Sequence, residues 1–195
     1  MKFIDITPHY FFDEAMALYG QTFPYEIRES EDVFLNSLRM GSERYHFVGI
    51  KIDDRLAAFI TFHIEKDHHV GFIVYLVVHP DFRGQKLAAK LIAYAEARML
   101  TVDGRLETVM LECEKDVFGS SPLESFYNKF DYRCYPIFYM QPGLHGDAPV
   151  PMNLFIKQLR DSSTIFLAIT QIYIAKYNEA NGISLTTLQD YISRM

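Results

Sequence analysis

Apolar residues recur along the chain with two different periods, and these periods predict its secondary structure. Alternation with period two predicts strands, and recurrence at three- and four-residue spacing predicts helices. Residues 70–78 (VGFIVYLVV) are apolar throughout, which predicts a strand buried on both faces at the centre of a sheet. Asp53-Asp54 predicts a hairpin turn, and Ser121-Pro122 predicts the start of a helix with Ser121 as its cap. We expect, in chain order, a strand over 2–7, helices over 11–19 and 30–40, strands over 45–52, 56–65 and 70–78, a helix after Arg83, a strand over 108–114, a short helix from Ser121, strands over 132–140 and 151–156, and helices over 163–179 and from Ser184.

This order of elements predicts a mixed α/β or α+β fold. We expect one domain over residues 1–160 and a helical extension over residues 161–195. The extension is apolar enough to need a surface to pack on, because it carries Ile165, Leu167, Ile172 and Ile174. That surface is either the domain itself or a second copy of the chain, which would make a homodimer.

Composition and charge narrow the class of protein. The chain has 195 residues, 49% of them apolar and 23% charged, as in an ordinary soluble domain. A net charge of −6 argues against nucleic acid as the main partner. Cys113 and Cys134 form neither a CxxC pair nor a ligand cluster, which favours a reducing compartment. No apolar run approaches the roughly 18 residues of a membrane span, and Asp5 interrupts the segment where a signal peptide would be apolar. We therefore expect a cytoplasmic protein with no membrane partner.

The segment VVHPDFRGQKLAAKLI, residues 77–92, joins a strand end, a turn with one glycine and the start of a helix. The first turn of a helix presents unpaired N–H groups and the positive end of the helix dipole, which suits a phosphate. Arg83 and Lys86 could add charged contacts. The alternative is an ordinary strand-turn-helix junction. The segment contains neither a Walker A sequence nor GxGxxG, so a nucleotide triphosphatase or a dinucleotide-binding fold is not indicated.

The same segment resembles the acetyl-CoA-binding segment of the GCN5-related N-acetyltransferases (GNAT), whose pattern is V-x-P-x-x-R-G-x-G-x-G/A followed by a leucine-rich helix. The matching residues are Val78, Pro80, Arg83, Gly84 and Ala88, and Lys86 replaces the second glycine. The order of elements is also similar over roughly residues 1–158. "TFPYEIRE", "FYMQP" and "PVPMNLFIKQL" resemble a bacterial subgroup of undefined substrate. The resemblance implies a mostly antiparallel twisted sheet with splayed central strands flanked by helices.

By this resemblance, the cofactor is acetyl-CoA. Backbone groups of Leu76, Val77 and Val78 would pair with its pantetheine arm. Its pyrophosphate would bind the amides of the helix entry, which are those of Arg83, Gly84, Gln85, Lys86, Leu87 and Ala88. We expect Lys86 to be helical and therefore tolerated without a positive φ, although its Cβ reduces clearance for the ligand.

The resemblance also implies two catalytic side chains. "SPLESFYNKFDYRCY" is similar to the family's FY-x-x-x-GF segment, whose tyrosine protonates the departing thiolate, a role that falls to Tyr127 here. Asp131 replaces the glycine of that segment. "MLECEKD" resembles a strand end whose glutamate deprotonates the amine, a role that falls to Glu112, with Glu114 as the alternative. The competing interpretations are a core tyrosine and a solvated or ion-paired glutamate.

The remaining candidates concern metal and acceptor sites. The histidines at 63, 68, 69 and 79 complete no spaced ligand set, so we expect no metal, and Cys113 is expected to be a buried small residue. By resemblance, the acceptor site comes from the early helices and the late loops. The candidates in these regions are Phe23, Tyr25, Glu26, Glu29, Glu31, Tyr139 and residues 141–145.

We therefore expect an acetyl-CoA-dependent N-acyltransferase that moves an acyl group directly to a primary amine of a small molecule or peptide. Two alternatives stay open. One is a non-catalytic acyl-CoA-binding sensor or interaction module. The other is an interaction protein in which Lys86 has abolished the cofactor site.

Overall fold

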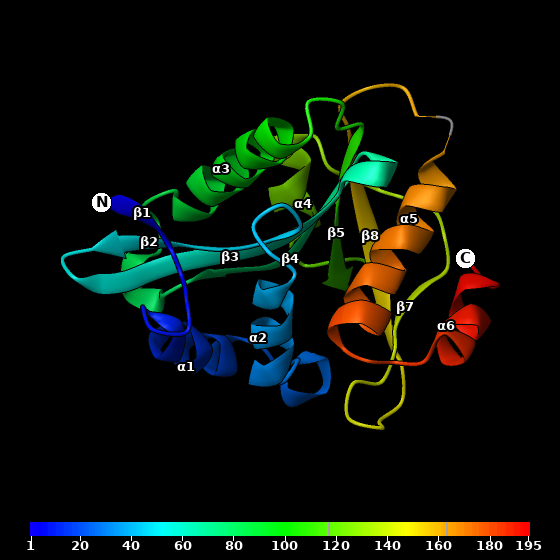
Figure 1. The fold of residues 1–195 in the computed structure, drawn as a ribbon, viewed down its shortest axis with the longest axis horizontal. Helices are drawn as coiled ribbons and strands as arrows, with labels where there is room; N and C mark the ends of the chain where they lie inside the picture. The colour runs from blue at the N-terminus through cyan, green and yellow to red at the C-terminus, as the bar shows by residue number, and fades with distance from the viewer. Residues whose placement is uncertain (117, 163) are drawn as a thin grey trace.

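The computed structural model describes residues 1–116, 118–162 and 164–195, which form an open eight-stranded sheet flanked by helices (Figure 1). The sheet order is β1-β2-β3-β4-β5-β8-β6, and β7 also pairs with β8. The β4–β5 pairing is parallel, and the other pairings between the named strands are antiparallel. The predicted mixed α/β fold is confirmed.

Most elements lie where the sequence predicts them. The strands are β1 (Lys2–Asp5), β2 (Tyr45–Ile52), β3 (Arg55–Glu65), β4 (Val70–Val78), β5 (Thr108–Glu114), β6 (Arg133–Cys134), β7 (Tyr139–Gln141) and β8 (Val150–Gln158). The helices are α1 (Phe12–Thr22), α2 (Glu31–Arg39), α3 (Leu87–Val102), α4 (Glu124–Tyr127), α5 (Ile165–Ile174) and α6 (Leu185–Ile192), with a π-helical turn, η5 (Ala175–Ala180), after α5. The predicted start of the penultimate helix, Ser163, lies outside the described residues.

The two faces of the sheet carry separate hydrophobic cores. On one face α3 and α4 pack through Leu91, Tyr127 and other residues onto the inward side chains of β3 and β5. On the other face α1 and α2 cover β2–β4 through residues such as Phe34, and α5 covers β5 and β8 through residues such as Ile169. Figure 1 shows α3 on one side of the long central strands and α1 and α2 on the other.

The central strands β4 and β5 separate after four paired residues. Val70–Ile73 pair with Thr108–Leu111, and neither strand has a partner across this gap beyond that point. A bulge contributes to the separation, because Phe62 and Thr61 of β3 oppose Ile73 and Tyr75 and leave Val74 as the extra residue of β4. Bulges bend a strand and increase its twist. The splayed central strands implied by the resemblance are thus present.

The prediction of one strand over residues 132–140 is wrong. The structure has two short strands instead, β6 and β7, and both pair with β8. Pro136 lies between them, and a proline has no N–H to donate to a sheet ladder. The chain turns there, with the N–H of Ile137 donating to the carbonyl of Tyr135 at 2.9 Å.

The cap predicted for the short helix is also wrong. Ser121 lies before the start of α4 and its hydroxyl donates to the carbonyl of Glu114 at 2.7 Å, which ties this segment to the end of β5. By contrast, Ser184 caps α6 as predicted, accepting a hydrogen bond from the N–H of Thr187 at 3.1 Å.

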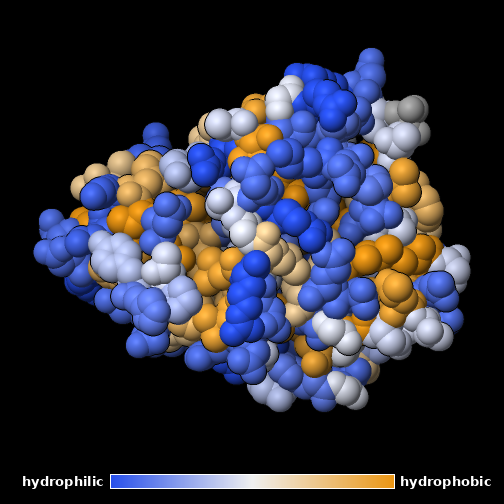
Figure 2. Space-filling model, viewed as in Figure 1, coloured by the Kyte–Doolittle hydropathy of each residue, from blue (hydrophilic) through white to orange (hydrophobic). Residues whose placement is uncertain are grey.

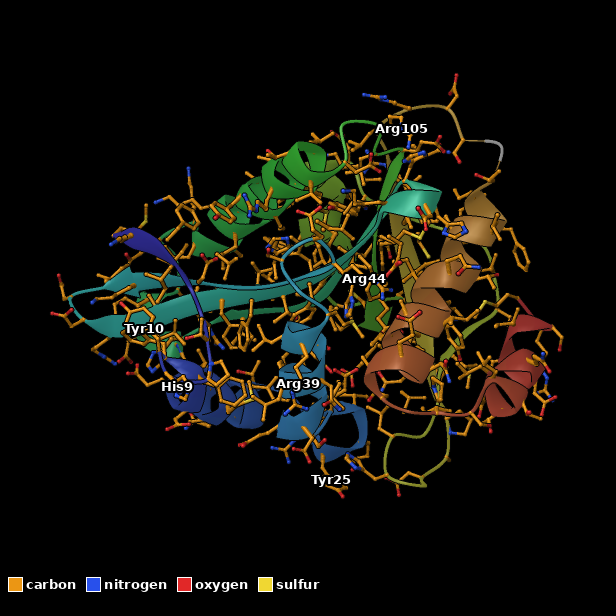
Figure 3. All side chains as sticks on the ribbon, viewed as in Figure 1. His9, Tyr10, Tyr25, Arg39, Arg44 and Arg105 are labelled. Carbon is orange, nitrogen blue, oxygen red and sulfur yellow. The ribbon has the colours of Figure 1, made fainter. Side chains whose placement is uncertain are left out.

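The helices after residue 164 pack on the sheet of the same chain. Ile169, Ile172 and Tyr173 of α5 are buried against β4, β5 and β8. Arg44, which directly precedes β2 and is labelled in Figure 3, joins β3 to η5. It forms ion pairs with Glu65 of β3 at 2.6 Å and with Glu179 of η5 at 2.8 Å. The outer side of α5 is hydrophobic as well, as Figure 2 shows over that helix, with Phe166 and Leu167 50% and 46% exposed. No helix in the described ranges is long and apolar enough to cross a membrane.

Two alanine substitutions in α5 test this packing. Ile169 is 1% exposed, so Ile169→Ala should lower the free energy of unfolding by about 2–5 kcal/mol, through lost burial and a residual cavity. Leu167→Ala, on the outer side of the same helix, should change it by less than about 0.5 kcal/mol. Urea unfolding measures both. A larger loss for Leu167→Ala than for Ile169→Ala would contradict the observed orientation of the helix.

Candidate active site

The gap between β4 and β5 opens into a pocket of about 250 Å³. Its walls come from both strands, from the segment between α1 and α2, from α4, and from β7 and β8. The lining residues are Phe23, Ile27, Val74, Tyr75, Leu76, Glu112, Cys113, Glu114, Pro122, Leu123, Tyr127, Gln141 and Met152. Because side chains of β4 and β5 point alternately to the two faces of the sheet, the pocket is reached by residues from both faces.

The turn before α3 has the features of an anion site. Gly84 has φ +79° and α3 begins at Leu87. Among the hydrogen bonds of the described residues, none uses the N–H of Gly84, Gln85 or Lys86. These amides precede a 16-residue helix. The N–H groups in the first turn of that helix also lack partners within the helix. The turn is held in place by its neighbours, since the N–H of Asp81 donates to Nδ1 of His79 at 3.2 Å and Asp81 pairs with Arg55 at 2.8 Å.

The expected conformation of Lys86 is wrong. The residue is left-handed, with φ +59°, and forms the N-cap position of α3 instead of its first turn. A side chain other than glycine pays on the order of 1–2 kcal/mol for this conformation. A glycine at this position, as in the family's pattern, would therefore adopt the left-handed backbone without this cost, and it would also leave more room for a ligand. Lys86 and Arg83 are both exposed beside the free amides, so both can reach an anion there.

The second half of β4 has an open edge on the β5 side. Leu76 lines the pocket, and Val77 and Val78 continue the part of β4 that has no partner on the β5 side. A strand edge with unpaired N–H and C=O groups accepts an extended ligand as an additional strand. The anion turn follows this edge directly in the chain. The residues present thus fit a ligand with an extended amide-containing arm and a pyrophosphate.

Tyr127 lines the pocket from the α3 and α4 face. It is 6% exposed and packs with Cys113 and Phe155. No hydrogen bond to its hydroxyl occurs in the described part of the chain. Burial raises the pKa of Tyr127 well above its usual value, because a phenolate would be desolvated there. The phenol is therefore protonated and can donate.

Glu112 lies on the opposite face of β5 and its carboxylate is enclosed. The Glu112 side chain is 4% exposed and forms an ion pair with Lys176 of η5. The hydroxyl of Tyr177 donates to both carboxylate oxygens at 3.0 Å. An ion-paired glutamate was one of the alternatives expected at this position, and the ion pair is present. Glu114, the other candidate base, lies at the exposed end of β5 and also lines the pocket.

A second buried carboxyl lies close to this pair. Glu29, between α1 and α2, is 8% exposed and accepts a hydrogen bond from Nδ2 of Asn181 at 2.9 Å. Asn181 also donates to the carbonyl of Lys176 at 2.7 Å. Burial raises the pKa of Glu29, an effect that the nearby Lys176 ammonium opposes. Lys176 and Tyr177 were not among the predicted site residues, since no local sequence pattern marks the contact of η5 with β5.

The expected acceptor residues divide between two places. Phe23 and Gln141 line the pocket at the strand gap. Tyr25, Glu29, Glu31 and His145 line a separate surface hollow, where the rings of Tyr25 and His145 stack at 4.3 Å. Tyr25 lies at the edge of the molecule below α2 (Figure 3). Tyr139 is buried behind the pocket, and Glu26 is exposed and lines neither place.

The histidines have structural surroundings. Burial, together with Arg44 and Lys176, lowers the pKa of His63 to about 3, so this imidazole is neutral. Nδ1 of His69 lies 2.7 Å from Oδ2 of Asp103, and His79 accepts the hydrogen bond described above. Within the described ranges, no cluster of three or more histidine, cysteine, aspartate or glutamate side chains could hold a metal. Burial also raises the pKa of Cys113 to about 12, which keeps its thiol protonated.

Solved acetyltransferase structures share this fold. A Bacteroides thetaiotaomicron protein described as a GNAT-family acetyltransferase matches with a TM-score of 0.69 at 21% identity, over 94% of this chain and 100% of that chain. The Escherichia coli ribosomal-protein-S18-alanine N-acetyltransferase matches with a TM-score of 0.60 at 15% identity, over 83% and 96%. An aminoglycoside 6′-N-acetyltransferase in complex with coenzyme A matches with a TM-score of 0.60 at 20% identity, over 83% and 99%. Comparison with curated protein sequences gives no match.

The family follows from the sequence itself. Residues 10–132, more than half of the chain, match the model of the acetyltransferase (GNAT) family. The chain therefore belongs to the acetyltransferase (GNAT) family. It is an N-acetyltransferase, of the kind that transfers an acyl group from acetyl-CoA to an amine. The matched segment contains the turn before α3, Glu112 and Tyr127, and it ends before β7 and the C-terminal helices.

The turn before α3 yields a binding prediction. Arg83→Ala and Lys86→Ala should each raise the Kd of acetyl-CoA about tenfold, because each removes a charge from the phosphate site. Calorimetric titration at low and high salt measures this, and the loss should shrink as salt screens the charges. Lys90→Ala, one turn further along α3, is the matched control and should leave the Kd unchanged. Equal effects of all three substitutions would place the phosphates elsewhere.

Proposed function

We propose that this enzyme transfers the acetyl group directly to a primary amine of a small molecule or peptide. The observation that carries the proposal is the pocket at the strand gap. One side of it includes Leu76 at the open edge of β4, which continues along the chain to the turn before α3, and its other side is lined by Phe23, Tyr75 and Gln141. A thioester and an amine held on the two sides of one gap can react without a covalent enzyme intermediate.

The residues around the gap would divide the proton transfers between them. Glu112 would take the proton of the acceptor ammonium through a water molecule, because its carboxylate is enclosed by Lys176 and Tyr177. The free amine then attacks the thioester carbonyl and the carbon–sulfur bond breaks. Tyr127 would donate its phenolic proton to the departing thiolate, and the second proton lost by the attacking nitrogen would restore the phenol. Glu112 would release the first proton to solvent. The products are the N-acetylated amine and the free thiol of CoA.

The same arrangement explains why a phenol suits the acid role. Burial raises the pKa of Tyr127, so its proton remains in place throughout the neutral range. The position of Tyr127 next to Leu76 and Cys113 puts that proton at the edge of the gap where β4 would hold the pantetheine arm. No observation favours the non-catalytic acyl-CoA-binding module, in which Tyr127 would serve the core alone.

Removing the phenolic hydroxyl tests the acid. Tyr127→Phe should lower kcat by about 10²–10⁴-fold while the Kd of acetyl-CoA stays the same, because general acid catalysis contributes rate and not ground-state binding. Steady-state kinetics with a panel of primary amines, together with calorimetry, measures both quantities. In the parent enzyme, the raised pKa means that activity should not fall through loss of this proton below about pH 10. Unchanged kcat in Tyr127→Phe would make the residue part of the core only.

A pair of glutamines tests the base. Glu112→Gln should lower kcat by about 10²-fold or more if Glu112 accepts the proton, whereas Glu114→Gln should leave kcat within about twofold. Glu112→Gln also leaves the Lys176 ammonium buried without a partner, at a cost of about 3–5 kcal/mol in the free energy of unfolding. Urea unfolding therefore accompanies the kinetics. A large effect confined to Glu114→Gln would transfer the role to Glu114.

A further inference from the structure

One polar side chain in the wall of the pocket carries a donor without a partner. Gln141 lines the pocket and is 2% exposed, and its Nε2 has no hydrogen-bond partner in the described part of the chain. A buried N–H group without a partner is unfavourable, and nearly all such groups in folded proteins are hydrogen-bonded. An oxygen atom of a ligand in the pocket would give this amide the partner that the described side chains do not supply.

The register of the sheet places this amide on the same side as the candidate base. Met152 lies opposite Tyr139 in the β7–β8 ladder and opposite Glu114 in the β5–β8 ladder. Directly opposed residues point to the same face of a sheet, as do residues two apart along a strand. The side chains of Gln141, Met152 and Glu112 therefore share one face. An amine that gives its proton to Glu112 would lie on the side of the pocket that Gln141 lines.

The charges around the pocket limit what the ligand oxygen can be. Glu112 and Glu114 line the pocket, and the described lining residues include no lysine, arginine or histidine. The Lys176 ammonium pairs with Glu112 and does not line the pocket. A carboxylate or phosphate group on the acceptor would therefore lose water without meeting a cation, and it would face the Glu114 carboxylate. The oxygen that suits the Gln141 amide is a neutral one, as in a carbonyl or hydroxyl group.

The size of the pocket limits the distance between the amine and this oxygen. The pocket has a volume of about 250 Å³. Pockets that enclose a whole drug-sized ligand are larger, at roughly 300–1,000 Å³. This pocket therefore holds one short end of the acceptor, with the amine and the oxygen only a few bonds apart. Phe23 and Ile27 supply apolar surface around that end.

We propose that the acceptor is an amine with a neutral oxygen on the carbon next to the amine-bearing carbon and with no anionic group, and that Gln141 recognises this oxygen by donating a hydrogen bond from Nε2. The inference rests on the proposed function, which it deepens by naming the class of amine. Gln141 is a specificity residue in this role, because it binds the acceptor and takes no part in proton transfer. Two kinds of molecule share the chemistry, an amine beside an amide carbonyl and an amino alcohol.

Four amines with the same apolar body test the proposal. Leucinamide carries a carbonyl oxygen at the stated position, leucinol a hydroxyl group, leucine a carboxylate, and 3-methylbutylamine only hydrogen. Calorimetry on the enzyme saturated with CoA, at about pH 6.5, compares all four with a protonated amine, because α-amino groups have pKa values of about 8 or above. Leucinamide or leucinol should bind at least about tenfold more tightly than 3-methylbutylamine, and leucine at least about tenfold more weakly than leucinamide. The tighter of leucinamide and leucinol identifies which kind of oxygen the site takes.

Substitutions at Gln141 identify the cause. Gln141→Leu removes the donor at similar size, so the advantage of the oxygen-bearing amines over 3-methylbutylamine should fall to within about twofold. Gln141→Glu offers only acceptor oxygens in its charged form and should abolish the advantage as well. Met152→Leu, a volume-conserving change on the same wall, is the matched control and should keep the full advantage.

Stability separates recognition from a role in the fold. Gln141→Leu removes an unpaired buried amide, so the urea midpoint of the ligand-free enzyme should not fall, and a lower midpoint would overturn the proposal. Equal binding of the oxygen-bearing amines and 3-methylbutylamine, leucine binding as tight as that of leucinamide, no binding of any of the four, or an unchanged preference in Gln141→Leu would overturn it too. Failure to acetylate any primary amine would overturn the proposed function, whereas the binding preferences, which need no turnover, decide the present inference.

Discussion

The separation of β4 from β5 is the constraint on which the rest of the site depends. Four residues of each strand pair, and the remaining edges stay open. Two facts maintain this state: the extra residue Val74 bends β4, and β8 holds β5 along its whole length from the other side. A sheet normally closes such an edge, because unpaired backbone groups are unfavourable away from water. We propose that the pantetheine arm of the cofactor takes the place of the missing strand, which would make the binding site part of the sheet and not an addition to its surface.

The parts of the fold that the sequence predicts are those governed by local chemistry. The continuous apolar run of β4, the paired aspartates of the β2–β3 turn and the serine cap of α6 each act over a few residues, and each lies where it was expected. The turn before α3 belongs to this group as well. Predictions of secondary structure and backbone conformation failed where a single residue departs from the pattern of its neighbours. Pro136 interrupts what the apolar pattern alone presents as one strand, and Lys86 adopts a left-handed conformation that its residue type gives no reason to expect.

The sequence predicted the part of the candidate site around Tyr127 and the turn before α3, but not the surroundings of Glu112. Tyr127 and the turn before α3 follow from motifs. Tyr127 lines the pocket at the strand gap, and the turn follows directly after the open edge of β4. The enclosure of Glu112 follows from contacts with Lys176 and Tyr177, which are 64 and 65 residues away in the sequence. No periodic pattern in the sequence predicts such a contact, because the residues of α5 and η5 predict only an apolar helix and not the strand on which it packs. The roles of Tyr127 and Glu112 in the reaction remain predictions, whereas their placement on opposite faces of the same gap is observed.

The location of Lys176 has a consequence for how the enzyme is made. A ribosome synthesises the chain from its N-terminus at roughly 5–20 residues per second, so the turn before α3 leaves the tunnel about 5 to 18 seconds before η5 does. During that interval the cofactor half of the gap can form, while the Glu112 carboxylate still lacks its cation and the inner face of β5 and β8 lacks α5. The nascent protein thus passes through a stage in which the Glu112 carboxylate and this hydrophobic face are open to water. Docking of the last helices ends that stage, because it covers the face and supplies the cation.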